Sequence, residues 1–332
     1  MTLLENALAC VGLRPAVRAW PPRSLSLALQ GGGSFGAFTW GVLDRLLEES
    51  EIAFDAVSGS SAGAVNAVLL ASGLADGGRA EAKARLERFW RRMSAAAAFL
   101  PSASLAASPL AASFGLLARA LSPYQLNPFN LNPLREALIA EVDFARLRAA
   151  SPLRLLIAAT RVRDGKLRIF TERELTVDAV LASACLPLIH HTVEIGGEPY
   201  WDGGYVANPP LLPLVQASRA EHLLIVQVTP TTSDRLPTAP RDIAKRLEQI
   251  QFNATLNAEL EALKTDIIVG ATPKLRRLRI GRISAQEEFA GLADESAGDL
   301  DRVFLERLRM SGRGAAEAWL EEATREGRPA AA

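Results

Sequence analysis

Apolar and polar residues alternate along the chain with two spacings, one typical of strands and one typical of helices. Residues 24–30 (SLSLALQ) predict a strand, and three consecutive glycines follow it at 31–33. Residues 35–49 predict a helix, because their apolar side chains recur on one broad face. Residues 54–58 predict a second strand, which leads through a turn rich in glycine and serine to an apolar helix at 64–72. This order of elements favours an α/β fold with a mainly parallel sheet.

The same alternation continues through the middle of the chain. Further strands are predicted at 153–160, 166–171 and 223–228. Asp164 and Gly165 separate the first two of these strands, and this dipeptide is typical of a hairpin turn. Asn132 followed by Pro133 predicts the start of a helix, and Thr176 predicts the cap of another.

Two regions depart from this pattern. Residues 94–123 contain eleven alanines and a single charged residue, Arg119. They are interpreted either as short helices packed over the core or as an apolar lid over a lipid-accepting pocket. Residues 233–241 predict a linker, and a long helix is expected from 242 to about 264. The basic stretch at 274–282 predicts a strand with one solvated basic face, with binding of anionic lipid heads as the alternative.

Composition excludes several classes of protein. The chain has 332 residues, and its 37 Lys and Arg balance 37 Asp and Glu, so it lacks the basic excess of a general nucleic-acid-binding protein. Two cysteines exclude a disulfide scaffold, and three histidines leave little for a histidine-rich metal site. The sequence has no apolar run of about 18 residues, and its N-terminus is unlike a secretory signal. We therefore expect a cytoplasmic protein, with association at a membrane surface left open.

The strongest signal for chemistry is residues 59–63 (GSSAG), between a predicted strand and a predicted helix. This is the G-x-S-x-G nucleophile elbow in the context that it requires. Glycines at its two ends avoid collisions with neighbouring backbone, the turn exposes the Ser61 hydroxyl, and the helix N-terminus favours a developing anion. Ser60 carries the same hydroxyl at the wrong position of the turn. The alternative is an ordinary connection between a strand and a helix.

A second glycine-rich turn, residues 31–36 (GGGSFG), also connects a strand to a helix. Gly31, Gly33 and Gly36 satisfy the G-x-G-x-x-G spacing of dinucleotide-binding folds, but no clear acidic partner follows about 20 residues later. Consecutive glycines also leave backbone N–H groups bare and able to hold an oxyanion. With an acyl-transfer serine thirty residues away, the oxyanion hole is the better interpretation.

A nucleophilic serine requires a base, and two kinds of candidate exist. One is a histidine, and the chain offers His190, His191 and His222. The order Ser61, Asp202, His222 suits an α/β-hydrolase triad, but His222 stands at the beginning of a strand, whereas triad histidines follow strand ends. The other candidate is Asp202 itself, in a Trp-Asp-Gly-Gly turn whose aromatic neighbours would provide a partly dry setting and raise its pKa above about 3.9.

Together these motifs resemble the patatin-like phospholipase family. The resemblance rests on GGGSFG at 31–36, GSSAG at 59–63 and DGG at 202–204, which continues as YVANPP. The stretches ASACLP at 182–187 and NPL at 132–134 are also similar to the family. The resemblance implies a three-layer α/β/α fold with a mainly parallel central sheet.

The resemblance spans about residues 25–228 and implies a serine–aspartate dyad without a catalytic histidine, cofactor or metal. Ser61 is then the nucleophile, and Asp202 is the base that takes its proton and returns it to the leaving group. Lipid acyl esters would be hydrolysed through an acyl-serine intermediate. The other site residues that it implies are Gly31, Gly32, Gly33, Ser34 and Gly36 in the oxyanion hole, Gly59, Ala62 and Gly63 in the elbow, and Gly203 and Gly204 in the dyad turn.

One position departs from the family pattern. Phe35 stands where the family usually has Arg or Lys, and loss of this charge favours a neutral or short acyl ester, or a polyester, over a phospholipid. A histidine-dependent esterase and a non-catalytic acyl-lipid-binding module remain as alternatives. We expect an N-terminal extension at 1–22, a catalytic domain at 23–230 and a helical C-terminal part at 231–332 packed on the same domain. The expected partner is a lipid or acyl-ester substrate, and not nucleic acid.

Overall fold

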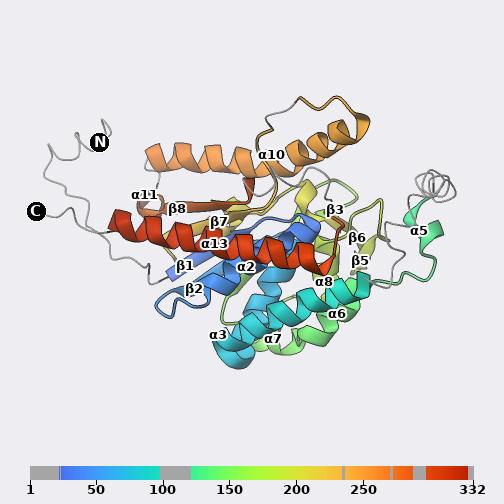
Figure 1. The fold of residues 1–332 in the computed structure, drawn as a ribbon, viewed down its shortest axis with the longest axis horizontal. Coiled ribbons are helices and arrows are strands. Elements are labelled where there is room, and N and C mark those ends of the chain that lie inside the picture. The colour runs from blue at the N-terminus through green and yellow to red at the C-terminus, as the bar shows by residue number, and fades with distance from the viewer. Residues whose placement is uncertain are drawn as a thin grey trace, which may run out of the picture.

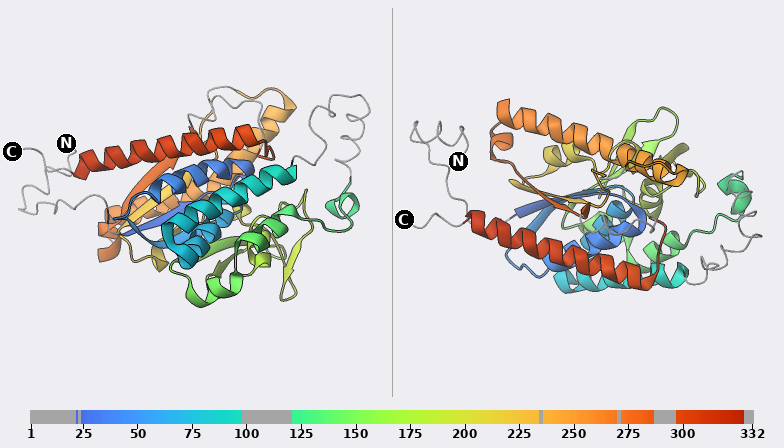
Figure 2. Two further views of the ribbon diagram at one scale, coloured as in Figure 1. Left: turned by 60° about the horizontal axis from the view of Figure 1, so that its bottom comes forward. Right: turned by 45° about the horizontal axis from the view of Figure 1, so that its top comes forward.

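The computed structural model describes residue 22 and residues 24–97, 121–233, 236–269, 272–286 and 297–327. All structural statements below concern these residues. The predicted N-terminal extension, apart from residue 22, lies outside them, and so do residues 98–120 of the predicted lid. Figures 1 and 2 show a central sheet with helices on both of its faces.

The sheet is built mainly from parallel strands in the order β5-β6-β3-β2-β1-β7-β8, and β4 pairs with β3 beside this path. Pairing is parallel among β3, β2, β1, β7 and β8, and antiparallel where β4 and β6 join β3 and where β5 joins β6. The strands are β1 (Ser24–Leu29), β2 (Ala53–Gly59), β3 (Arg154–Arg161), β4 (Leu167–Thr171), β5 (Val193–Ile195), β6 (Glu198–Asp202), β7 (His222–Gln227) and β8 (Arg279–Ser284).

Helices cover the two faces of the sheet in two separate layers (Figure 1). One layer contains α2 (Gly36–Leu46), α3 (Ala62–Ala97), α6 (Pro133–Glu141), α7 (Phe144–Ala150), α8 (Val177–Ser183) and α13 (Arg302–Gly327). The other contains α9 (Leu211–Ala217), α10 (Pro240–Val269) and α11 (Pro273–Arg277). Figure 2 shows α10 and α13 on opposite sides of the sheet, which confirms the expected three-layer α/β/α fold. None of the described helices is both long and apolar enough to span a bilayer.

Strand β1 shows why the sheet needs both layers. Leu25, Leu27 and Leu29 are fully buried against α2, α3 and α13 in the larger core. Ala28 points to the other face and packs in the smaller core beneath α9 and α10. Because side chains alternate between the faces of a strand, a central strand buried on both sides is mostly apolar. In residues 25–29 the exception is Ser26, which is buried and forms a hydrogen bond of 2.7 Å with the hydroxyl of Ser218.

Several local predictions are confirmed. Asn132 and Thr176 cap helices α6 and α8, since their side chains accept hydrogen bonds from the backbone N–H groups two and three residues later, at 3.1 and 3.2 Å. The Asp164-Gly165 turn joins β3 to β4 as an antiparallel hairpin. The helix predicted at 64–72 begins at Ala62 and ends before Gly77 and Gly78, which have non-helical backbone angles, and a second helical segment of α3 continues from there to Ala97.

The prediction of a strand throughout 274–282 was wrong in its first half. Thr272 accepts a hydrogen bond from the N–H of Leu275, and Pro273 occupies the first helical position, so the chain forms the short helix α11 first. The strand β8 begins only at Arg279 and pairs in parallel with β7. The basic residues Lys274, Arg276 and Arg277 lie in the last turn of α11, where cations interact favourably with the helix dipole.

The C-terminal helix α13 packs closely along α2. The approach depends on glycine at two positions, because a Cβ on Gly41 would collide with the carbonyl oxygen of Arg309, and one on Gly312 with that of Phe38. Asp44 of α2 is buried and accepts hydrogen bonds from Arg309 and Arg313 at 3.0 and 2.6 Å. These contacts hold the end of the chain against the layer that surrounds the larger core.

Substitution of Gly312 by alanine should destabilise the protein by roughly 1–3 kcal/mol, because the added methyl group forces α13 away from α2. Gly314 lies two residues further along α13 with nothing within 4 Å of its Cβ position, so Gly314→Ala should stabilise the protein by about 0.5–1 kcal/mol. Urea unfolding of the two variants measures the difference. Equal effects would show that the contact between α2 and α13 is looser than described.

Candidate active site

The predicted serine and aspartate come from strands that meet on one edge of β3. Gly59, the last residue of β2, pairs with Ile157. Asp202, the last residue of β6, pairs with Ala159. β4 pairs with both of these β3 residues and fills the opposite edge, so β2 and β6 share one edge and meet end to end. At about 3.3 Å per residue, their ends lie about 7 Å apart along β3.

Ser61 lies on a sharp bend between β2 and α3. Its backbone has φ of +53°, the left-handed region that residues other than glycine rarely adopt. A Cβ on Gly59 would lie 2.6 Å from the carbonyl carbon of Gly63, so the bend requires glycine there. The Ser61 N–H donates to the carbonyl oxygen and to the hydroxyl of Ser183, at 3.1 and 3.0 Å. α3 begins at the next residue, Ala62, so its N-terminus points at this bend.

Asp202 is fully buried at the end of β6. Its Oδ1 accepts a hydrogen bond of 2.7 Å from the N–H of Gly204, and its own N–H donates to the carbonyl oxygen of Cys185 at 2.8 Å. Oδ2 has no hydrogen-bond partner of normal length among the described residues. Burial raises the pKa of Asp202 to about 7, and the Gly204 N–H and the nearby Ser61 hydroxyl lower that pKa in part. The carboxylate is therefore half ionised near neutral pH and has one oxygen available.

The glycine loop after β1 lies directly against the serine bend. A Cβ on Gly31 would be 2.7 Å from the Cβ of Ser61. The N–H of Gly31 donates to Asn208, that of Ser34 to the carbonyl oxygen of Ala297, and that of Gly36 to carbonyl oxygens within the turn. The N–H groups of Gly32 and Gly33 donate no hydrogen bond to a described residue, and both glycines line the cavity at Ser61. Of the five residues expected in the oxyanion hole, these two have N–H groups without a hydrogen-bond acceptor among the described residues, and we expect these groups to bind an anion.

The segment that follows the aspartate turn joins the three parts of the site. The Asn208 side chain is buried, its Oδ1 accepts a 2.7 Å hydrogen bond from the N–H of Gly31, and its Nδ2 donates to the carbonyl oxygen of Phe252 at 3.3 Å. The preceding residue, Ala207, accepts a hydrogen bond from the hydroxyl of Ser60. Sequence reasoning gave Asn208 no role and treated Ser60 as a bystander, although the run after DGG was the signal that could have indicated Asn208.

A buried cluster of amide side chains connects α10 to the glycine loop. Asn253 of α10 accepts hydrogen bonds from Gln30 and Gln227 at 3.0 and 2.8 Å. The Gln30 side chain in turn accepts hydrogen bonds from the N–H groups of Val228 and Thr229. Gln30 immediately precedes Gly31, so the position of the loop depends on a residue more than 200 positions later in the chain.

The cavity in front of Ser61 and Asp202 has a volume of about 450 Å³. Its larger apolar lining residues are Phe35, Leu186, Ile189, Pro230 and Phe252. The first turns of α10 contribute the polar residues Asp242, Lys245, Glu248 and Gln249. The site therefore combines a hydroxyl, a carboxylate and bare N–H groups at one wall with an apolar space large enough for part of an acyl chain.

The histidines lie elsewhere. His222 is the first residue of β7 and pairs with Leu25 at the start of β1, about 20 Å along the strand from the glycine loop. His191 packs against the ring of Tyr124, and burial lowers the pKa of His190. None of the three lines the cavity at Ser61. Nor do the described His, Cys, Asp and Glu residues form a group of three or more that could hold a metal ion.

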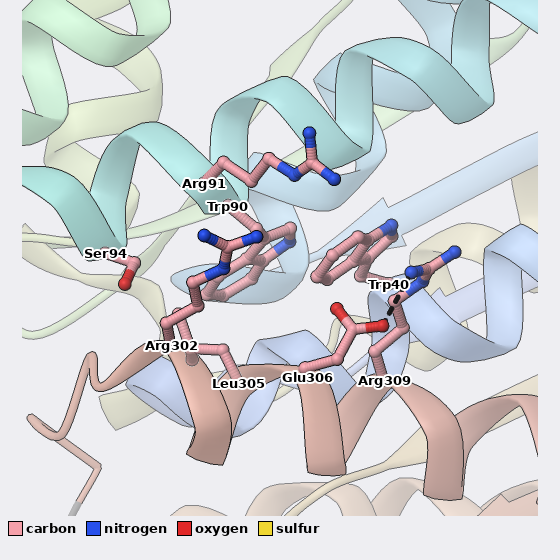
Figure 3. A pocket seen from close by; sticks show the side chains of 8 residues that line it. All are labelled: Trp40, Trp90, Arg91, Ser94, Arg302, Leu305, Glu306 and Arg309. Carbon is pink, nitrogen blue, oxygen red and sulfur yellow. Dashed lines mark hydrogen bonds and ion pairs between the residues drawn. The ribbon is translucent and has the colours of Figure 1, made fainter.

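A second cavity, of about 220 Å³, lies between α2, α3 and α13 (Figure 3). Trp40 and Trp90 form its floor as nearly parallel rings 6.5 Å apart. Glu306 is paired with Arg309 at 2.7 Å, and Figure 3 shows Ser94 at the opposite end of the cavity from this carboxylate. Glu306 is the only carboxylate among the described residues that line this cavity, and it does not lie beside the Ser94 hydroxyl, so the cavity at Ser61 remains the candidate active site.

Comparison with solved structures gives distant likenesses. VipD from Legionella pneumophila is 17% identical with a TM-score of 0.47, over 91% of this chain and 67% of VipD. The type III effector protein ExoU is 17% identical with a TM-score of 0.38, over 92% of this chain and 54% of that protein. A chain of the heterodimeric complex ExoU–SpcU from Pseudomonas aeruginosa is 19% identical with a TM-score of 0.30, over 73% of this chain and 52% of that chain. The chain thus spans about two-thirds of VipD and about half of ExoU.

Comparison with family models is more informative. Among curated proteins no sequence matches this chain. The model of the patatin-like phospholipases matches residues 27–215, which include the glycine loop, the serine bend and the aspartate turn. This match covers more than half of the chain and supports lipid acyl hydrolase activity in general. The chain belongs to the patatin-like phospholipase family.

Proposed function

We propose that this protein is a serine acyl hydrolase that cleaves lipid acyl esters with Ser61 as nucleophile and Asp202 as general base. The observation that carries the proposal is the carboxylate of Asp202, which is fully buried, has a pKa raised to about 7 and lies close to the Ser61 hydroxyl. A free aspartate has a pKa of about 3.9 and is a poor base at neutral pH. Burial brings its proton affinity near the value that general-base catalysis requires.

The reaction proceeds in two halves. Oδ2 of Asp202 takes the proton of Ser61 while Oγ attacks the ester carbonyl carbon, and the resulting oxyanion binds the N–H groups of Gly32 and Gly33. Asp202 then gives the proton to the leaving alcohol, and the acyl group stays on Ser61. In the second half Asp202 takes a proton from water, the hydroxide attacks the acyl-serine, and the fatty acid leaves as the proton returns to Ser61.

The lining of the cavity favours an uncharged or zwitterionic ester. Phe35 lines the cavity where the family usually has Arg or Lys, and its ring packs edge-on against Phe304, with 6.2 Å between the centroids. The wall from α10 carries Asp242 and Glu248 against Lys245, so it adds no excess of positive charge for an anionic head group. A neutral or short-chain ester is therefore the second candidate substrate, beside the lipid acyl ester proposed above. A panel of esters that vary in chain length and head group distinguishes these two candidate substrates.

Ser61→Ala should lower kcat by roughly 10³–10⁶-fold, because it removes the nucleophile while the fold is retained. The variant should also lose labelling by a fluorophosphonate probe. Ser60→Ala is the matched control, since it removes the neighbouring hydroxyl and its bond to Ala207, and we expect it to lose far less activity. If the folded wild-type protein is not labelled, it is a non-catalytic acyl-lipid-binding module.

The kcat/KM of the wild-type protein should rise with pH through an apparent pKa of about 7, because only the ionised carboxylate of Asp202 accepts the serine proton. Asp202→Asn keeps the shape and removes the base, so it should lose most activity at every pH. A pH–rate profile without this limb, or full activity in the variant, contradicts the dyad.

The same pKa predicts a dependence of stability on pH. The folded protein keeps a proton on Asp202 between pH of about 4 and about 7, where the unfolded chain has lost it. This term therefore stabilises the fold at low pH and is lost as pH rises to 7, by at most about 4 kcal/mol. Asp202→Asn removes this contribution. The melting temperature of the variant should therefore rise relative to that of the wild type as pH increases from about 4 to about 7. A constant difference across this range contradicts the raised pKa.

Asn208→Ala should lower kcat by about 10–100-fold with little change in KM, because it releases the peptide of Gly31 that fixes the oxyanion loop. Asn257→Ala, on the exposed side of α10, is the matched control and should have no effect. Steady-state kinetics on variants shown to be folded decide the matter. An unchanged kcat in Asn208→Ala means that the loop keeps its position without this side chain.

A further inference from the structure

Six large apolar side chains are exposed in two chain segments that contact each other beside the cavity at Ser61. They are Tyr124, Leu126, Phe129, Leu131, Leu188 and Ile189, with exposed fractions from 47% to 85%, and together they are named the apolar rim. Exposed apolar side chains that gather in one place indicate a site of interaction. Figure 1 shows the short helix α5 (Pro123–Leu126), which begins this region, at the same end as the β5–β6 hairpin.

The two chain segments of the apolar rim are joined to each other and to the cavity at Ser61. The rings of Tyr124 and His191 lie 4.2 Å apart, and the Tyr124 hydroxyl accepts a hydrogen bond from the N–H of Thr192 at 3.2 Å. Ile189, two residues before His191, is both exposed and part of the cavity lining. The apolar surface therefore runs from α5 into the space in front of the serine.

The apolar rim is also free of charge. Residues 120–134 and 179–193 contain no Asp, Glu, Lys or Arg. Arg135 and Asp178 stand directly beyond these stretches and form an ion pair with each other. A surface of this kind gains little from binding a charged partner, but it gains free energy when its apolar side chains leave water.

Internal hydrogen bonds hold the loop that carries most of the apolar rim. Ser122 and Gln125 form a capping box at the start of α5. The Asn127 side chain bonds both to the N–H and to the carbonyl oxygen of Leu131, each at 2.9 Å. Phe129 and Leu131 therefore lie in a loop whose backbone is held by its own hydrogen bonds, which reduces the cost of ordering the loop when it binds.

We propose that the apolar rim docks on the surface of aggregated lipid with uncharged or zwitterionic head groups. The inference rests on the proposed function, because a lipid surface is the partner that both contacts the apolar rim and delivers an acyl ester to the adjoining cavity. A second copy of the chain seated on the apolar rim would instead cover Ile189 and the mouth of that cavity. Docking inserts apolar side chains at the interface, so it depends little on ionic strength.

The binding experiment uses the Ser61→Ala protein and phosphatidylcholine vesicles, so that its result does not depend on turnover. In this background Phe129→Ser combined with Leu131→Ser should weaken vesicle binding by about tenfold or more. Met310→Ser, an exposed apolar position on α13, is the matched control and should bind as before. Both proteins should keep their melting temperature, and binding should change less than about twofold between low and high salt.

The kinetic experiment uses the same substitutions in the active enzyme. Hydrolysis of a soluble, monomeric short-chain ester should be unchanged, since Phe129 and Leu131 do not line the cavity, and hydrolysis of vesicle-bound ester should fall by about tenfold. If wild-type protein hydrolyses neither ester, the proposed function fails, whereas the binding result still stands or falls independently. Unchanged vesicle binding in the double variant overturns the apolar rim as a lipid-docking surface. A change from dimer to monomer in sedimentation with unchanged vesicle binding also overturns it and assigns the surface to a second copy.

Discussion

The withdrawal of one carboxylate from water is the constraint on which the site depends. Asp202 ends β6 with no solvent contact, and its charge is stabilised only by the N–H of Gly204 and the nearby hydroxyl of Ser61 among the described residues. An isolated charge in such a place is costly, and the pKa of about 7 expresses that cost. The sheet imposes this position. β6 pairs antiparallel with β3 on the same edge as β2, directly beyond the residue at which the pairing of β2 ends. The position at which β6 ends thus determines the raised pKa of this carboxylate.

Residues around the carboxylate give the rest of the site its geometry through buried polar contacts. Ser60 and Asn208 fasten the serine bend and the glycine loop to the segment after Asp202. Consequently the proposed nucleophile, the proposed base and the proposed oxyanion-binding groups are not held by three independent loops. Each buried donor or acceptor that lost its partner would cost free energy, so the polar contacts favour one arrangement over looser ones.

The sequence allowed prediction of features that depend on near neighbours. The bend at Ser61 follows from the glycines at 59 and 63, and the order of strands and helices follows from periodicity. What could not be predicted depends on partners far apart in the chain. Gln30 and Asn253 are 223 residues apart, and β6 is a short strand whose place beside β2 is visible only in the assembled sheet. Even the boundary of β8 was misjudged, because Thr272 and Pro273 start a helix within a basic stretch.

The amide cluster at Asn253 has a consequence for how short an active version of this enzyme can be. The family match ends at residue 215, so a fragment designed from that match alone would end near that point. Such a fragment would lose β7, the strand beside β1. It would also lose Asn253, whose side chain accepts a buried hydrogen bond from Gln30. The glycine loop would then begin at an uncovered sheet edge. The smallest autonomous hydrolase must accordingly extend at least through α10, well past the motifs that resemble the family.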